Sequence, residues 1–267
     1  MPEHRVLVTG AAGVVGKLMR PRLIRSDRIL RMLDVRPLEP AAPGERVELL
    51  TGSVTDPEVM ASACRDTDAV IHLGGISRED SWERILEVNI AGTQTVLEAA
   101  RAAGVPRVVL ASSNHSVGFR RIGEAGPDGL PADSSPRPDT YYGVGKAAME
   151  ALGSLYHWRF GMDVTCLRIG SCFERPADVR QLSLWLSPDD CARLLESCLA
   201  AKEPDYRVLW GVSANTRSVV SLREAAEIGY ESLDDAEAFA GEVPAGVLPE
   251  FLGGAFCDTP LGQSNPL

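Results

Sequence analysis

Apolar runs alternate with amphipathic segments along most of the chain. Unbroken apolar stretches of this length are typical of strands buried on both faces, and the 3.6-residue patterns between them are typical of helices. The pattern predicts strands over 5–10, 29–35, 47–54, 68–75, 107–113, 163–171 and 206–213. It predicts helices over 14–24, 56–67, 81–104, 142–159 and 187–201.

This alternation predicts an α/β fold, a doubly wound parallel sheet of the Rossmann type with a small C-terminal substrate-binding region. We expect one domain over 1–267, with about 1–165 as the dinucleotide-binding core. About 166–267 would be mostly substrate-binding, and its last part would wrap the surface. In such a sheet, ligands bind at the carboxyl ends of the strands.

Composition narrows the classes of protein. No apolar run reaches the length of a membrane span, and the N-terminus lacks the features of a secretory signal, so we expect a cytoplasmic protein. The net charge of -10 without a basic tract argues against nucleic acid as a partner. The six cysteines are scattered without a CxxC pair, which predicts reduced thiols and no metal site.

A glycine-rich stretch, VTGAAGVVG, joins the first predicted strand to the first helix. Gly10, Gly13 and Gly16 let backbone approach a pyrophosphate, and the helix N-terminus favours its negative charge. Val14 and Val15 lie in the same turn and are expected to contact the cofactor. The alternative is a tight strand-to-helix turn without a ligand.

Asp34 ends the second predicted strand, followed by Val35. A carboxylate there can accept hydrogen bonds from the hydroxyls of the adenosine ribose and would repel a 2′-phosphate, which favours NAD over NADP. Arg36 works against this preference, and Asp34 could also be an ordinary turn residue.

The stretch DTYYGVGKAAME places Lys146 four residues after Tyr142. The chain has only three lysines against 24 arginines, so a lysine at this position suggests a role that a guanidinium cannot fill. Residues four apart share one helix face, and an ammonium there would favour a phenolate. We therefore expect the pKa of Tyr142 to move toward the working pH. The alternative is an ordinary helix surface.

With these motifs the chain resembles the extended type of the short-chain dehydrogenase/reductase superfamily. The resemblance rests on Gly10, Gly13, Gly16, Asp34, Asn89 in VNIAGT, Ser113 in ASSNHS, Tyr142 and Lys146. It implies that Tyr142 is the general acid/base, that Lys146 lowers its pKa and holds the nicotinamide ribose, and that Ser113 hydrogen-bonds the reacting oxygen. Further NAD contacts are implied at Leu73, Gly74, Gly75, Asn89 and Ile169.

The third strand departs from the pattern of that superfamily. An aspartate near the adenine usually ends this strand, whereas here Ser53 stands at that position. We expect Ser53 and Val54 to take over the adenine contact.

A closer resemblance, to bacterial uronate dehydrogenases, covers nearly the whole chain. It rests on HLGGIS, ASSNHSVGF, YYGVGK, LRIGSC, VRQLSLWLSPDD and GGAFCDTP. It implies oxidation of the anomeric carbon of D-glucuronate or D-galacturonate by NAD to an aldarolactone, without a metal.

A hexuronate carries a carboxylate and several hydroxyls, so its site needs a cation and short polar side chains. We expect substrate contacts from Ser77, Ser113, Asn114, His115, Tyr142, Ser171, Arg180 and Phe256. The resemblance gives Arg180 the carboxylate, held by a two-pronged bond. Arg175 and Arg168 compete for this role, and Arg168, inside a predicted strand, is expected to be structural. Arg180 could instead face solvent, and Phe256 could be a core aromatic.

Three other functions remain open. An NAD-dependent sugar epimerase or dehydratase of the same superfamily would show no net NADH formation, and the short C-terminal region argues against it. A non-catalytic NAD-sensing regulator would not need the Tyr142/Lys146 pair. A serine hydrolase built on Ser113 and His115 lacks a GxSxG turn. We also expect a homo-oligomer.

Overall fold

The computed structural model describes residues 4–264 and is built around one parallel sheet. Its seven strands lie in the order β3-β2-β1-β4-β5-β6-β9. They are β1 (His4–Thr9), β2 (Arg28–Asp34), β3 (Val47–Thr51), β4 (Ala69–His72), β5 (Arg107–Ser113), β6 (Asp163–Ile169) and β9 (Tyr206–Gly211). The order reverses between β1 and β4, which is where a doubly wound sheet binds its ligand. The predicted sheet and its seven strands are confirmed.

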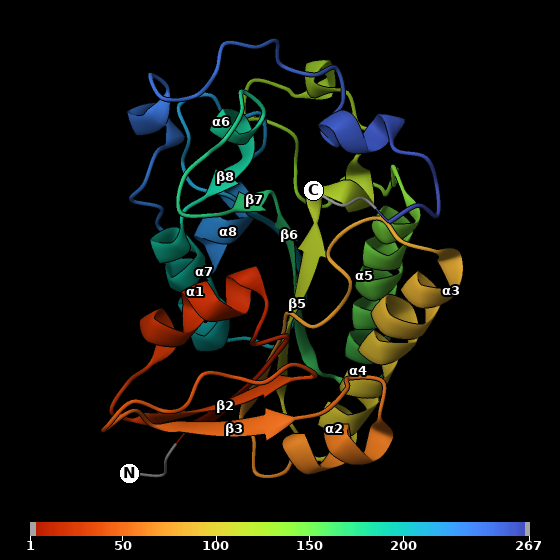
Figure 1. Ribbon diagram of the computed structural model, residues 1–267, viewed down its shortest axis with the longest axis vertical. Coiled ribbons are helices and arrows are strands. Elements are labelled where there is room, and N and C mark those ends of the chain that lie inside the picture. The colour runs from red at the N-terminus through yellow and green to blue at the C-terminus, as the bar shows by residue number, and fades with distance from the viewer. Residues whose placement is uncertain (1–3, 265–267) are drawn as a thin grey trace.

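Helices cover both faces of the sheet (Figure 1). On one face lie α1 (Val14–Leu23), α7 (Pro188–Ala200) and α8 (Arg223–Glu227), and on the other α2 (Pro57–Ala63), α4 (Gly92–Ala102) and α5 (Tyr141–Phe160). Successive strand residues serve opposite faces: Val6 and Val8 pack in the core under α1 and α7, and Leu7 packs under α2 and α4. Unbroken apolar strands are therefore needed.

The helix starts follow the sequence signals. The side chain of Asp56 accepts hydrogen bonds at the start of α2, and Ser187 does the same for α7, with a proline in the first turn of each. Thr140 accepts the bond from the Gly143 N–H and caps α5.

The long helix predicted over 81–104 is not uniform. It begins as α3 (Trp82–Arg84), widens into a π-helical segment over Ile85–Ala91, and continues as α4. The widened segment carries Asn89, whose amide bonds the backbone of Ile76 twice, at 2.8 and 2.9 Å. The 3.6-residue pattern could not reveal this segment, because it arises from a contact with another part of the chain.

The strand predicted over 163–171 ends at Ile169. At Gly170 a Cβ atom would lie 2.0 Å from the Leu184 carbonyl oxygen, so the chain passes another backbone there. Beyond it, β7 (Ser171–Cys172) pairs with β8 (Trp185–Leu186) in a second, two-stranded sheet. These strands, with α6 (Gln181–Leu184), form the small region above the main sheet in Figure 1.

The C-terminal segment crosses back over the carboxyl ends of the strands. It includes two 3-10 turns, Ala236–Phe239 and Gly254–Asp258. Leu252 joins a third core cluster with Val117 and Trp210, so the segment is packed against the fold. Among residues 4–264, every helix is too short or too polar to cross a lipid bilayer.

Candidate active site

The glycine-rich turn after β1 has no room for side chains. Gly10 has a φ of +71°, and a Cβ there would lie 2.6 Å from the Gly74 nitrogen. A Cβ at Gly16 would lie 2.6 Å from the Ala11 carbonyl oxygen. The glycines are therefore required by backbone packing as well as by any ligand.

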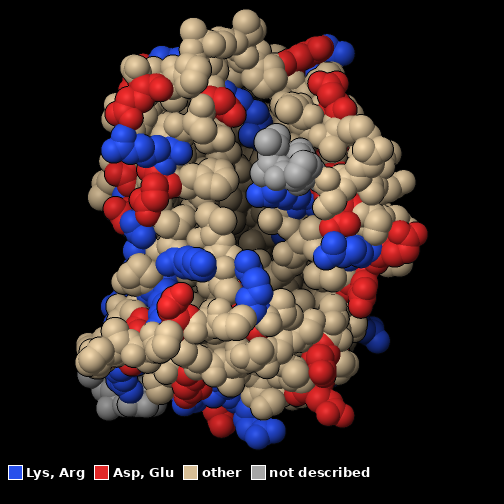
Figure 2. Space-filling model, viewed as in Figure 1, with Lys and Arg blue, Asp and Glu red and all other residues tan. Residues whose placement is uncertain are grey.

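The N-terminus of α1 opens at this turn. Gly13 is its N-cap, with no side-chain hydrogen bond to the first helical N–H groups, so these remain available to a phosphate. Val14, at the start of α1, is 58 % exposed and Val35, just after β2, is 63 % exposed, and such exposed apolar side chains suit a flat ring. Figure 2 shows this face hollowed near its centre, level with the carboxyl ends of β5 and β6, with basic side chains around the rim. The residues present fit a dinucleotide.

Asp34 is buried and engaged on both oxygens. Oδ2 accepts from the Ala12 N–H at 2.9 Å, and Oδ1 accepts from the Arg36 N–H at 2.9 Å. The exposed Arg36 guanidinium also reaches Oδ1, at 3.3 Å. Asp34 therefore positions the glycine turn. It is the last residue of β2, at the carboxyl end of the sheet, where the adenosine ribose of a bound dinucleotide would lie.

Ser53 and Val54, expected near the adenine, follow β3. The Ser53 hydroxyl accepts from the Thr55 N–H at 3.1 Å and hydrogen-bonds the Thr55 hydroxyl at 2.8 Å, so it already serves a local turn. Val54 is buried beneath the backbone of Gly74. Contact between Ser53 and adenine stays a prediction.

A buried histidine, His72, lies beneath the cofactor half of the site, which comprises the glycine-rich turn over 10–16, the N-terminus of α1 and Asp34. His72 ends β4, and its ring bonds the Thr9 hydroxyl at 2.7 Å and the Thr93 hydroxyl at 3.3 Å. Burial lowers the pKa of His72 to about 3, with a smaller effect from the charge of Lys146. The ring is neutral and holds β1 to β4 below Leu73 and Gly74.

Tyr142, Ser113 and Lys146 come together as predicted. Tyr142 and Lys146 lie on the buried face of α5, and Ser113 ends β5. The Lys146 Nζ lies 5.6 Å from the centroid of the Tyr142 ring and donates to the Ala111 carbonyl at 2.6 Å.

The expected pKa of Tyr142 is wrong for the chain as it stands. Burial raises the pKa of Tyr142 to about 12, outweighing a hydrogen bond with Ser113, and the charge of Asp139 raises it further. Burial also lowers the pKa of Lys146 to about 8. Desolvation of the phenolate therefore has a larger effect on the pKa of Tyr142 than the hydrogen bond or the nearby ammonium that would favour the phenolate, because Tyr142 is only 7 % exposed.

An ion pair supports the helix behind these groups. Glu150, one turn after Lys146, binds the Arg168 guanidinium with two bonds of 2.8 and 2.9 Å, and both side chains are buried. Glu150 also accepts from the hydroxyls of Ser112 and Ser116, which flank Ser113. Arg168 is structural, as expected.

The substrate half contains a cation without an acidic partner. Arg180 Nε donates to the Leu252 carbonyl at 2.7 Å. With the Asn114 amide turned so that its oxygen faces the guanidinium, Asn114 accepts from Arg180 Nη2 at 2.6 Å and donates to the Ile169 carbonyl at 3.2 Å. Burial lowers the pKa of Arg180. Within residues 4–264, no carboxylate forms an ion pair with it.

His115 and Phe256 form the adjoining wall. Their rings stack with centroids 4.0 Å apart, and His115 meets the Tyr142 ring edge-on at 5.7 Å. His115 Nδ1 lies 2.6 Å from Asp139 Oδ2. Burial lowers the pKa of His115 and outweighs the opposite effect of Asp139.

The remaining candidates are less closely linked. Ser77 is exposed after β4, and Ser171 is buried in β7. Arg175, the other competitor for the carboxylate, is exposed and paired with Glu242 at 2.6 Å. It is therefore a poorer candidate than Arg180.

Sequence reasoning missed two buried carboxylates at this site. Asp139 bonds His115, and Glu79 accepts the backbone N–H groups of Tyr142 at 2.9 Å and Gly262 at 2.8 Å. Asp139 lies three residues before Tyr142, and Glu79 lies two residues after HLGGIS. These hydrogen-bond partners are at least 24 residues away in the sequence, so no local pattern could reveal them. A carboxylate close to a candidate motif was the one available signal.

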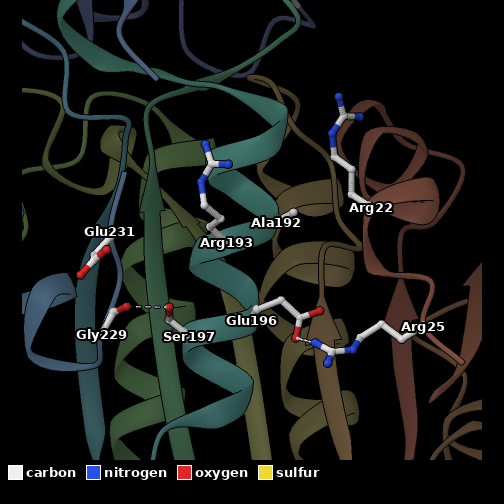
Figure 3. A pocket seen from close by; sticks show the side chains of 8 residues that line it. All are labelled: Arg22, Arg25, Ala192, Arg193, Glu196, Ser197, Gly229 and Glu231. Atoms are coloured by element: carbon white, nitrogen blue, oxygen red, sulfur yellow. Dashed lines mark hydrogen bonds and ion pairs between the residues drawn. The ribbon is translucent and has the colours of Figure 1, made fainter. Parts of the chain in front are cut away.

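A separate hollow lies on the α1–α7 side (Figure 3). It has a volume of about 420 Å³ and includes none of the site residues above. Its arginines are paired: Arg22 with Asp189 at 2.6 Å, and Arg25 with Glu196 at 3.5 Å. Because acidic side chains already pair with these two arginines, the hollow offers little charge to an anionic ligand.

Comparison with known proteins agrees with this geometry. Residues 6–228 match the NAD dependent epimerase/dehydratase family. The chain belongs to this family. The uronate dehydrogenase of Agrobacterium fabrum is 41% identical over 98% of this chain and 99% of its own length. The NAD-dependent glucose-6-phosphate dehydrogenase of Haloferax volcanii is 36% identical over 90% of this chain and 97% of its own.

A solved structure shows the same fold. A mutant uronate dehydrogenase from Agrobacterium tumefaciens, crystallised with NAD, superposes with a TM-score of 0.88 at 38% identity, covering 97% of this chain and 98% of its own. The resemblance to uronate dehydrogenases drawn from sequence motifs is confirmed.

Proposed function

We propose that this protein oxidises the anomeric carbon, C1, of a hexuronate with NAD and releases the aldarolactone. D-glucuronate and D-galacturonate are the candidate substrates. The single observation that carries the proposal is Arg180, a half-buried guanidinium at the site that has hydrogen-bond partners but, among residues 4–264, no carboxylate within ion-pair distance. Such a cation is poorly solvated, and an anionic substrate would compensate it.

The glycine turn, the N-terminus of α1 and Asp34 would hold NAD, whose nicotinamide supplies the hydride acceptor when bound. Lys146 would contact the adjoining ribose. Full-length similarity to NAD-linked sugar dehydrogenases supports this assignment of the cofactor.

The chain's own groups would carry the proton. The C1 hydroxyl of the sugar would lie between Ser113 and Tyr142, whose side chains are close enough for Ser113 to lower the pKa of Tyr142. As the phenolate, Tyr142 would accept the hydroxyl proton while the C1 hydride leaves, and the C1–O bond would become the lactone carbonyl. Burial disfavours the phenolate in the free protein, and the positive charges of Lys146 and of a bound nicotinamide would favour it. Ser113 holds the same oxygen while its charge changes. Arg180 orients the far end of the sugar.

Reduction of NAD by the purified protein tests the proposal. The panel contains glucuronate and galacturonate, the neutral sugars glucose and galactose, and glucose 6-phosphate as a sugar with a different anion. We expect NADH only with the uronates, because the carboxylate replaces the missing partner of Arg180. NADP in place of NAD is the parallel control, with weaker turnover expected because of Asp34.

The other outcomes identify the rivals. Turnover of neutral sugars at the same efficiency would contradict the carboxylate-binding role of Arg180. Preference for glucose 6-phosphate would assign the site to a phosphosugar. Tight NAD binding without NADH from any sugar would favour an epimerase or a regulator.

A further inference from the structure

Asp139 is a buried carboxylate that the mechanism above does not use. Its side chain has an exposed fraction of 0%. One oxygen, Oδ2, lies 2.6 Å from His115 Nδ1, and the other, Oδ1, accepts from the Thr140 hydroxyl at 2.9 Å. It directly precedes the Thr140 cap of α5 and so stands beside the helix that carries Tyr142.

Three glycines shape the space around this carboxylate. A Cβ at Gly118 would lie 1.9 Å from Oδ2, and one at Gly253 would lie 2.1 Å from the same atom. A Cβ at Gly143 would lie 2.9 Å from Oδ1. These glycines come from the turn after β5, the C-terminal segment and α5. The slot therefore holds a carboxylate in one place and leaves it no room to turn away from His115.

The contact decides the hydrogen positions on His115. A carboxylate only accepts hydrogen bonds, so the ring nitrogen facing Asp139 carries the hydrogen. Burial keeps the pKa of the ring below its ordinary value, so the second nitrogen, Nε2, carries a lone pair. Among residues 4–264, none hydrogen-bonds this Nε2, although the residue is only 8 % exposed. Stacking on Phe256 prevents the ring from flipping freely.

We propose that Asp139 is a positioning residue that holds His115 as the Nδ1–H tautomer, so that Nε2 accepts a hydroxyl of the sugar beside Tyr142. This inference rests on the proposed function and deepens it, because it gives the site one acceptor of defined direction. The arrangement selects a substrate that presents a hydroxyl donor there. With the opposite tautomer, Nε2 would be a donor, and the hydroxyl would have to turn and accept from it, leaving its own hydrogen to another partner.

Nitrogen NMR of protein labelled with ¹⁵N-histidine tests the tautomer without any substrate. The chain has only four histidines, and a His115→Gln variant assigns the signal. We expect His115 protonated on Nδ1 at pH 7. His72 is an internal contrast: Thr93 Oγ1 donates its hydrogen to the Asn89 carbonyl and so accepts from Nε2, which makes His72 the Nε2–H tautomer. A bare Nδ1 on His115, or a doubly protonated ring, would overturn the proposal.

The variant Asp139→Asn tests the consequence. The amide has the shape of the carboxylate but can offer an N–H to His115, so the Nδ1–H form should lose population. We expect the KM for the uronate to rise about tenfold, with kcat and the KM for NAD little changed. Asp27→Asn, at an aspartate 58% exposed, is the matched control and should change neither constant.

The outcomes separate the two proposals. An unchanged KM for uronate, or a fall in kcat alone, would reduce Asp139 to a structural role and contradict the inference. If Asp139→Asn does not fold, the spectrum of the unaltered protein still decides the tautomer. Absence of NADH from any uronate with the unaltered protein would defeat the proposed function, whereas the spectrum would still judge the contact between Asp139 and His115.

Discussion

The two halves of the candidate active site differ in the groups that form them: backbone in the cofactor half, and side chains in the substrate half around Arg180, Asn114, His115 and Phe256. The cofactor half consists mainly of backbone: the Gly10 turn, the open N-terminus of α1, and Asp34 holding the Ala12 N–H. These three features are encoded within one stretch of about the first 35 residues. The substrate half consists mainly of side chains. In its central contacts Arg180 joins Asn114 to the Leu252 carbonyl, and Arg180 and Leu252 are 72 residues apart in the sequence.

This difference explains what each half can vary. Backbone N–H groups and missing Cβ atoms recognise a pyrophosphate, which is the same in every nicotinamide cofactor. Side chains drawn from separate segments can change one at a time, so we expect this half to set which sugar is oxidised. Tyr142 stands where the halves meet, because α5 carries it between Ser113 and the His115–Phe256 wall.

The largest effect is expected at this junction. Tyr142→Phe removes the proton acceptor and should lower kcat by about 10² to 10⁴-fold, while NAD binding is kept. The assay is steady-state NADH formation with the preferred uronate, together with NAD titration. Tyr141→Phe is the matched control, since Tyr141 contacts Trp82 edge-on and has no lysine one turn later. Normal turnover by Tyr142→Phe would rule out the mechanism.

A somewhat smaller effect should be confined to the substrate half. Arg180→Ala removes a charge-assisted bond and should raise the KM for uronate about 10- to 100-fold, with the Kd of NAD unchanged. Arg175→Ala removes an exposed arginine instead and should leave the KM as it is. If Arg180→Ala has the same KM as the unaltered protein, the cation belongs to the fold and not to the substrate site.

Gly10→Ala should damage the cofactor half. The new Cβ would clash with Gly74 and would require a positive φ, which costs about 1–3 kcal/mol in the free energy of unfolding. We expect weaker NAD binding by calorimetry and a lower Tm. Gly123→Ala, where a Cβ meets no atom within 4 Å, is the control. Full NAD affinity in Gly10→Ala would show that the turn does not approach the cofactor closely.

The smallest effect concerns His72, which lies beneath the cofactor half. Burial holds the pKa of His72 at about 3, below its ordinary 6.5, so between these values the unfolded chain binds a proton that the folded chain does not. The free energy of unfolding should therefore fall as pH drops from 6.5 toward 3, by up to about 1.4 kcal/mol per pH unit from this group. Burial of His115 acts in the same direction.

Urea unfolding at pH 7, 6 and 5 measures this slope. His72→Gln should flatten it, and His4→Gln, at an exposed histidine, should leave it unchanged. Equal slopes for the two variants would show that His72 does not control stability in acid.

Local patterns predicted much of this protein. Apolar runs located the seven strands, Ser187 and Pro188 marked the start of α7, and the spacing of Tyr142 and Lys146 located the buried face of α5. These features depend on neighbours within a few residues, so they are readable from the chain. The choice of Arg180 over Arg175 came from the resemblance, and burial and pairing now support it.

Other features depend on distant partners and could not be read in advance. The π-helical segment forms because Asn89 reaches the backbone of Ile76, and the pKa of Tyr142 rises because the packed site removes water from the phenol. The burial of Asp139 likewise depends on Gly118 and Gly253, which enclose it from segments distant in the sequence.

The amino-acid order is therefore sufficient for the sheet, the glycine turn and the shared helix face of Tyr142 and Lys146, because short-range periodicity and backbone sterics act within each segment. Protonation states, hydrogen-bond direction and the partial burial of the Arg180 charge arise only when segments far apart in the sequence exclude water together. Desolvation is a property of the assembled site, and no single stretch of the chain carries it.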